Sequence, residues 1–331
     1  MARFALASID HGWTVAQRVA LERAHVRLES LVVLLLLGGV MAFLSPFFLS
    51  VGNLLNILLA TATIGILAIG ATFVISGGGL DLSLGSVMGL AGVAGAWTCV
   101  TLGLPAPLGV AACLGAGMAA GWINGQLVTR AGVPAFIVTL GMLGLARGLA
   151  LVISDGRVIY GLPSGLVWLG QGRPFGVPTP VFIFIFAALI AHYALAYTRF
   201  GRHTLALGDS EGAARAAGLR VERHRRALYV IAGLTAGLAG MVFMARVNSG
   251  DPTAGMSYEL TAITAAIIGG TNLFGGRGSV LGAMIGALIM GVLQNGLNLM
   301  AVQSYYQQMA IGAVLILAVF IDQRQARGAR A

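Results

Sequence analysis

TRFGRHTLALGDSEGAARAAGLRVERHRR, from Thr198 to Arg226, is the long polar interruption in an otherwise apolar sequence. It carries seven arginines together with Asp209, Glu211 and Glu222. Charged side chains are costly in hydrocarbon, and an irregular backbone cannot satisfy its hydrogen bonds there. We therefore expect this segment to be a loop in water on one side of a membrane.

The rest of the sequence is typical of a polytopic membrane protein. The chain has 331 residues, of which 58% are hydrophobic and 9% charged; its mean hydropathy is +0.90, whereas soluble domains are about a quarter charged. Three stretches, 30–80, 82–129 and 279–321, contain no Asp, Glu, Lys or Arg. Each is long enough for two helices of roughly 20 residues. We predict an all-α fold of about ten transmembrane helices.

The distribution of arginine predicts the orientation. Arginines precede the first span, crowd the loop 199–226 and follow the last span, which is the pattern of cytoplasmic segments. We expect a cytoplasmic N-terminal segment (1–29), a single transmembrane domain (30–322) and a cytoplasmic tail (323–331). The formal net charge of +9 is then an orientation signal. Binding of nucleic acid or anionic lipid is the less favoured alternative.

Hydropathy and turn residues give the limits of the expected spans. The predicted spans are 30–48, 53–76, 84–102, 108–128, 135–153, 179–197, 227–245, 260–274, 279–297 and 305–321. The eighth and tenth are short enough to be tilted or partly re-entrant. Glycines spaced four apart, as in Gly117 and Gly121, Gly144 and Gly148, or Gly233 and Gly237, predict close helix packing.

The middle of the loop 199–226 reads as a short helix. Asp209 or Ser210 can serve as its N-cap, alanines at 213, 214, 216 and 217 favour helix, and Gly218 is a stop signal.

Several kinds of chemistry are disfavoured by what the sequence lacks. All 20 basic residues are arginine, so the chain has neither a P-loop lysine nor a Schiff-base lysine. Cys99 and Cys113 are expected to be small buried residues rather than a metal site or a disulfide. The spans hold no cluster of His, Asp, Glu or Cys for catalysis, and no mid-membrane carboxylate for ion coupling. We expect no enzyme activity, and any uphill transport must draw its energy from a partner at the cytoplasmic face.

A few polar residues within the spans could line a path. Arg147 is the one charge well inside a span, and it can either face an aqueous path or extend outward to the interface. The uncharged candidates are Asn124, Thr139, Gln294, Asn295 and Asn298. Amides and hydroxyls suit a neutral polyhydroxylated solute, but they also form hydrogen bonds between helices.

Four motifs and the closing stretch together resemble a known family. The motifs are VISGGGLDLSLGSVMGLAGV (from Val74), NGQLVTRAGVPAFIVTLGMLGLARGLALVISDG (from Asn124), TRFGRHTLALGDSEGAARAAGL (from Thr198) and AIIGGTNLFGGRGSVLGAMIGALIMGVLQNGLNLM (from Ala266). They resemble the membrane subunit of ribose-type monosaccharide ABC importers. The closing SYYQQMAIGAVLILAVFID, from Ser304, is similar to the ribose branch.

The resemblance implies a type II importer fold in a bacterial inner membrane. It implies a dimer with a second permease copy or a paralogue, two cytoplasmic ATPase subunits that bind ATP and Mg, and a periplasmic sugar-binding protein. No cofactor is expected in this chain. The coupling helix that contacts the ATPase would be Asp209, Ser210, Glu211, Gly212, Ala213, Ala214, Arg215, Ala217 and Gly218. The resemblance does not assign residues that contact the sugar.

Two alternatives remain open. The more distantly similar permeases for branched-chain amino acids would need a site for a zwitterion instead of a sugar. A stand-alone secondary carrier would work without an ATPase, although the spans offer no acidic residue to couple it to an ion.

Overall fold

The structure is a computed structural model that describes the backbone of residues 15–328, with side chains from residue 28 to 320 and at 323 and 324. In chain order the helices are α2 (Val15–Leu44), α3 (Val51–Ser76), α4 (Leu84–Ala96), the π-helical turn η1 (Trp97–Thr101), α5 (Ala106–Thr129), α6 (Ala135–Ile153), α7 (Ser164–Gln171), the 3-10 turn η2 (Pro174–Gly176), α8 (Thr179–Tyr197), α9 (Arg199–Asp209), α10 (Glu211–Ala216), α11 (Val221–Val247), α12 (Tyr258–Ile268), α13 (Val280–Leu299) and α14 (Ser304–Gly328). The predicted terminal segments, 1–29 and 323–331, fall partly outside the described residues.

The helices confirm the all-α polytopic fold. Among the described residues, seven helical segments are long and apolar enough to cross a membrane. Three further apolar segments, 28–44 in α2, 258–268 in α12 and 304–320 in α14, are shorter than this length. Strand structure in the described chain is limited to β1 (Ile159–Tyr160), which pairs antiparallel with β2 (Ser249–Gly250).

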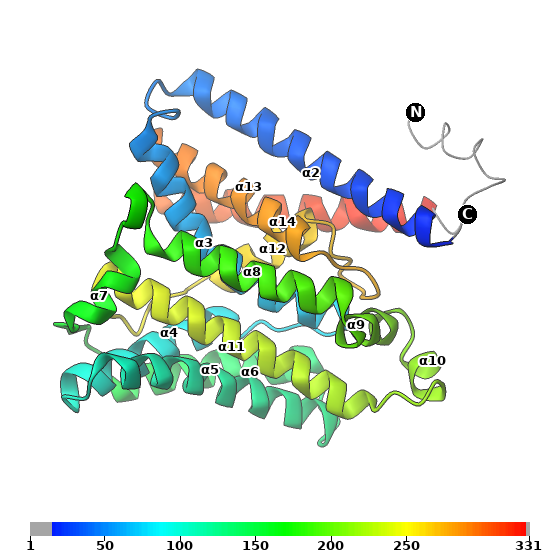
Figure 1. The fold of residues 1–331 in the computed structure, drawn as a ribbon, viewed down its shortest axis with the longest axis horizontal. Coiled ribbons are helices and arrows are strands. Elements are labelled where there is room, and N and C mark those ends of the chain that lie inside the picture. The colour runs from blue at the N-terminus through cyan, green and yellow to red at the C-terminus, as the bar shows by residue number, and fades with distance from the viewer. Residues whose placement is uncertain (1–14, 329–331) are drawn as a thin grey trace.

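The helices lie side by side, so the molecule has two ends. Figure 1 shows the start of α2, the last turns of α14, α9 and α10 at one end, which we call the basic end because it carries Thr198–Arg226. The opposite end, which carries α7 and the turn between α2 and α3, is called the far end. Both ends of the described chain therefore lie on the same side as the polar segment.

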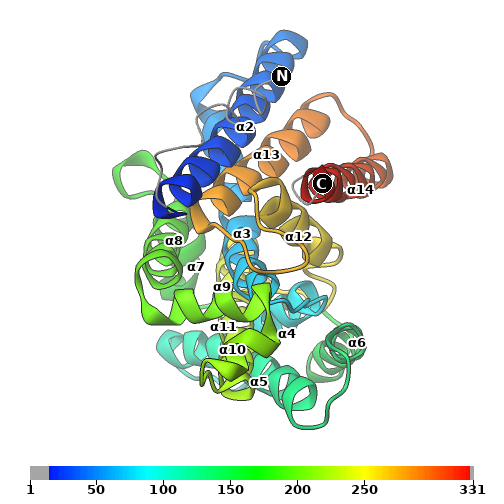
Figure 2. The same cartoon turned by 90° about the vertical axis from the view of Figure 1, so that its right-hand side faces the viewer.

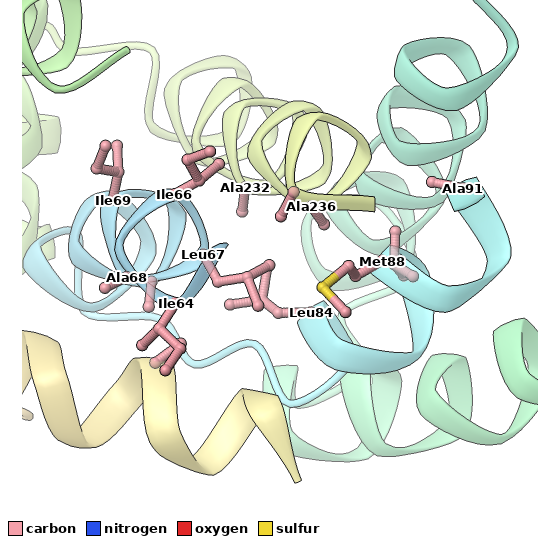
Figure 3. Packing of buried hydrophobic residues seen from close by; sticks show 14 of the residues in the cluster. Ile64, Ile66, Leu67, Ala68, Ile69, Leu84, Met88, Ala91, Ala232 and Ala236 are labelled. Carbon is pink, nitrogen blue, oxygen red and sulfur yellow. The ribbon is translucent and has the colours of Figure 1, made fainter. Parts of the chain in front are cut away.

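The core surrounds α3. This helix is apolar on all sides and lies against α4, α8, α11, α12 and α13. Figure 3 shows Ile66 and Leu67 of α3 close to Ala232 of α11 and Leu84 of α4, all of which are almost completely buried. A helix that is hydrophobic all round belongs in the interior of a bundle, whereas a one-sided helix faces the surroundings. The molecule is thus built around its second apolar segment.

Close packing through glycine is confirmed for one predicted pair of helices. A Cβ placed on Gly117 of α5 would lie 2.2 Å from the carbonyl oxygen of Gly233 in α11, so only glycine permits this approach. The pair Gly144 and Gly148 on α6 behaves differently, because a Cβ on either would meet nothing within 4 Å. The prediction that this pair brings two helices of the chain together is wrong.

Two of the expected limits also need correction. The eighth span was expected to cover 260–274, but α12 ends at Ile268, after eleven residues. The chain turns at once, with Gly270 and Gly275 at φ +87° and +92°, a conformation that residues with a side chain rarely adopt. The first expected span, 30–48, also ends too late, because α2 ends at Leu44.

Candidate functional site: a short capped helix at the basic end

The predicted short helix is present as α10, and Ser210 caps it. The Ser210 hydroxyl accepts a hydrogen bond from the backbone N–H of Ala213 at 3.3 Å, which satisfies one of the donors left unpaired at a helix start. Glu211 lies in the first turn, where a negative charge is favourable. Asp209, the other candidate cap, is instead the last residue of α9.

Gly218 ends α10 as predicted. Its φ is +86°, and the N–H of Leu219 donates to the carbonyl of Ala214 at 3.0 Å while the N–H of Gly218 donates to that of Arg215, also at 3.0 Å. These two bonds form the Schellman motif, which satisfies the last carbonyls of a helix. Both ends of α10 are therefore fixed by local chemistry.

Small side chains cover the outer surface of α10. Ala214 is buried and faces the protein, whereas the exposed positions are Glu211, Gly212, Ala213, Arg215, Ala216, Ala217 and Gly218. A Cβ on Gly212 would meet nothing within 4 Å. The exposed surface of the helix therefore consists of glycine and alanine, together with the charged side chains of Glu211 and Arg215.

Two ion pairs connect α10 to α11, and a third lies within α10. Arg225 donates to Glu211 at 2.7 Å, and Arg215 bonds Glu222 at 2.8 Å and Glu211 at 3.1 Å. The hydrogen bond from Arg225, reinforced by Arg215, holds the pKa of Glu211 below its ordinary value. Exposed pairs of this kind contribute about 0–1 kcal/mol each. Their main effect is to fix the orientation of α10 relative to α11.

The helix before α10 was not predicted. Arg199–Asp209 was read as part of a loop, yet it forms α9, with Thr198 as N-cap accepting from the N–H of Gly201 at 3.3 Å. Its buried face is marked by Gly201, Thr204 and Leu207 at a spacing of three residues. That period was the signal for an amphipathic helix, obscured by the two arginines that begin it.

Gly208, near the end of α9, lies between two turns of the bundle. A Cβ on Gly208 would be 2.0 Å from the carbonyl oxygen of Ser76 and 2.5 Å from the nitrogen of Gly276. The N–H of Gly276 also donates to the carbonyl of Ser76 at 3.1 Å. The α3–α4 turn, the α12–α13 turn and α9 therefore meet backbone against backbone. We call this junction of Ser76, Gly208 and Gly276 the glycine seat.

The path candidates are dispersed among several helix contacts. Asn124 is buried and donates to the Ser83 hydroxyl at 3.1 Å. Thr139 is also buried and bonds the carbonyl of Ala135, one turn earlier in α6. Asn124 therefore bonds a side chain between α3 and α4, and Thr139 bonds the backbone of its own helix.

The candidates on α13 form hydrogen bonds with other residues than Asn124 and Thr139. Asn295 and Asn53 exchange two amide hydrogen bonds of 2.8 and 2.9 Å between α13 and α3. Asn298 accepts from Gln307 at 2.8 Å, and Gln294 is half-buried on the same helix. The hydrogen bonds thus assign Asn124, Thr139, Asn295 and Asn298 to separate local contacts within the described chain.

Arg147 reaches across to another segment. Its Nη1 donates to the carbonyl of Pro252 and, at 2.8 Å, to that of Ala254. The side chain therefore connects α6 to the segment between β2 and α12.

Fold and site together describe a polytopic membrane protein that carries one small capped helix outside its bundle of spans. The chain belongs to the family described as branched-chain amino acid transport system / permease component, which matches residues 53–319.

Individual relatives extend this result along most of the chain. The chain is 44% identical to the ribose import permease protein of Escherichia coli (strain K12) over 304 residues, which cover 90% of this chain and 94% of that protein. It is 39% identical to the ribose import permease protein of Bacillus subtilis (strain 168), covering 94% and 97%. It is also 37% identical to the D-allose transport system permease protein of Escherichia coli (strain K12), covering 88% and 90%.

Proposed function

We propose that this chain is the permease subunit of an ATP-driven importer in a bacterial inner membrane, and that α10 is the helix through which a cytoplasmic ATPase acts on it. The observation that carries the proposal is a helix capped at both ends and held outside the bundle, with small side chains turned outward. Such a helix gains nothing for the fold by being exposed. It fits a surface made to contact a partner.

The glycine seat gives a route for the motion. A force on α10 passes into α9, since the two helices are separated by one residue. Gly208 transmits it by direct backbone contact to the turns that end α3 and precede α13. Close-packed backbone moves as a unit because it has no side chains to absorb the displacement. ATP and Mg belong to the ATPase subunits in this proposal.

A monosaccharide is the proposed solute. The relatives named as ribose and D-allose permeases align along nearly the whole chain, and relatives named for L-arabinose and xylose are each 35% identical. A periplasmic sugar-binding protein would deliver the solute at the far end. At Gly144 and Gly148 of α6 an added Cβ would meet nothing within 4 Å in the described part of the chain, so they are a suitable surface for a second permease.

A branched-chain amino acid is the second candidate solute, because the description of the matching family names that class. The two candidates differ in charge: one is a neutral polyol and the other a zwitterion. The ligand of the cognate binding protein decides between them. Binding of a branched-chain amino acid with no binding of pentoses or hexoses would overturn the sugar assignment.

The role of α10 is tested by placing a bulky charge on its outer surface. Gly212→Arg and Ala213→Arg should reduce sugar-stimulated ATPase activity of the reconstituted complex, because a side chain that does not fit costs about 2 kcal/mol at an interface, roughly thirtyfold in docking. Ala131→Arg is the matched control, since Ala131 is exposed in the turn between α5 and α6, outside α10. Unchanged activity in both α10 variants would exclude the coupling role.

A further inference from the structure

Helix α12 begins in the middle of the bundle. It has eleven residues, so it is about 16 Å long. Its last residue, Ile268, lies at the basic end, where its carbonyl accepts a hydrogen bond from Ser30 at 2.7 Å. Because a bilayer core is about 30 Å thick, the first turn of α12, with Glu259, lies near mid-membrane depth. This placement differs from the expectation that the spans hold no mid-membrane carboxylate.

Arg147 reaches the same depth from α6. Twelve residues separate it from the start of α6 at Ala135, which corresponds to about 18 Å along the helix axis. Its hydrogen bonds to the carbonyls of Pro252 and Ala254 place the segment 251–257 at that level. Two independent measures of depth, along α6 and along α12, therefore agree.

The irregular segment 251–257 fits there because α4 offers glycines. A Cβ on Gly85 would lie 2.3 Å from the carbonyl oxygen of Gly255, and one on Gly89 would lie 2.6 Å from that of Ala254. Irregular backbone at membrane depth is tolerated where protein buries it or where it lines a water-filled space. Discontinuous helices of this kind mark solute sites in other membrane transporters.

The charges at this level are not fully enclosed. Arg147 and Glu259 are both half-buried, and Arg147 lies within electrostatic range of Glu259 and Asp251. A charged side chain costs at least about 2.5–3.5 kcal/mol against hydrocarbon, so the open side of these two residues must be covered by water or protein. Figure 2 shows α6 and α14 on the same side of the molecule, with α4 and α12 between them.

We propose that Arg147, Glu259 and the backbone of 251–257 form a water-filled contact site at mid-membrane for a neutral polyhydroxylated solute. This assignment of a site rests on the proposed function as a sugar permease. Both described hydrogen bonds of the Arg147 guanidinium start from Nη1, which leaves Nε and Nη2 to donate to hydroxyl or ring oxygens. The Glu259 carboxylate accepts from hydroxyl groups of the same solute.

Accessibility to water tests the site directly. Glu259→Cys, in a background with Cys99→Ala and Cys113→Ala, should react with a hydrophilic membrane-impermeant thiol reagent in the assembled complex. Leu189→Cys on α8 is the control, because Leu189 is exposed on an apolar helix on another side of the molecule. We expect about tenfold faster reaction at position 259, since a thiolate forms only in water. Equal slow reaction at both positions in every nucleotide state would overturn the proposal.

Protection identifies the solute class. A pentose or hexose delivered by the binding protein should slow the labelling of Glu259→Cys during turnover. Protection by a branched-chain amino acid, without protection by any sugar, would overturn the polyol assignment.

Transport kinetics separate a contact residue from a structural one. Glu259→Gln keeps the size of the side chain and removes its charge, and it should lower the maximal uptake rate per folded complex about fivefold. The KM for uptake should stay unchanged, because the binding protein sets it. Arg147→Lys should behave similarly, since lysine cannot bond two carbonyls and a solute in the same planar arrangement.

The proposed function and this inference fail in different ways. If the wild-type complex transports no monosaccharide, the proposed function is wrong. If the wild type transports it while Glu259→Gln and Arg147→Lys retain its full rate, only the mid-membrane site is wrong.

Discussion

The contact between α5 and α11 offers the sharpest test of the packing. In Gly117→Ala, the new Cβ would lie 2.2 Å from the carbonyl oxygen of Gly233 and 2.7 Å from the nitrogen of Gly237. An ordinary van der Waals contact begins at 3.4 Å, so the helices must separate by more than 1 Å at this point. The atoms in the way are backbone, which cannot rotate aside.

The expected cost follows from this geometry. Inserting a methyl group into a well-packed interior costs about 1–3 kcal/mol, and α5 and α11 share the most extensive helix contact in the described chain. Each kcal/mol corresponds to about 2 °C in Tm for a chain of this size. Gly117→Ala should therefore lower the apparent Tm of the detergent-solubilised protein by several degrees. The Tm can be measured from the fluorescence of a dye that does not react with thiols, or from the loss of monodisperse protein on heating.

The same helix supplies the control. Gly115→Ala is the identical substitution two residues earlier, where a Cβ meets nothing within 4 Å. Alanine is the better helix former by about 0.5–1 kcal/mol, so Gly115→Ala should leave the Tm unchanged or raise it slightly. If Gly117→Ala and Gly115→Ala have the same Tm, the backbone contact between α5 and α11 does not determine how closely these helices pack.

Two further predictions concern polar groups. Asn53 and Asn295 should show a coupling of about 0.6 kcal/mol, and at most about 1.7, in a double-mutant cycle of alanine variants followed by thermal unfolding; zero coupling would contradict the observed amide pair. Burial raises the pKa of the Asp81 carboxyl above its ordinary value, although the hydroxyl and N–H of Ser83 bond it. A raised folded-state pKa means that the stability Asp81 contributes is present in acid and is lost as the pH rises through that pKa. Asp81→Asn, whose oxygen can still accept from Ser83, should therefore melt above the wild type at neutral pH, and the gap should close toward acid pH; a gap that widens in acid would refute this reasoning.

Much of the fold could be predicted from the sequence because uncharged stretches and prolines mark the spans. The predicted spans 135–153 and 179–197 coincide with α6 and α8. Hydropathy alone failed at α12, because the uncharged residues 269–274 resemble a continued span while Gly269 and Gly270 in fact turn the chain. The difference is one of backbone conformation, to which a hydropathy average is insensitive.

The candidate site was predictable to the extent that its chemistry is local. Ser210 and Gly218 cap α10 through bonds within a few residues, and such bonds can be read from sequence. The glycine seat could not be predicted from the sequence, because Ser76, Gly208 and Gly276 meet only once the whole bundle is assembled. For the same reason the sequence left the partners of Arg147 open: the carbonyls of Pro252 and Ala254 are more than 100 residues away.

The central position of α3 bears on how the protein is made. This helix is synthesised among the first spans, yet two of the helices that enclose it, α11 and α13, are translated more than 140 residues later. Until they are made, Thr61, Thr63 and Asn53, which are buried in the complete fold, lack the helices that cover them. A ribosome stalled before α11 therefore leaves a chain with an unfinished interior, a form that membrane quality control can recognise by the polar groups it displays.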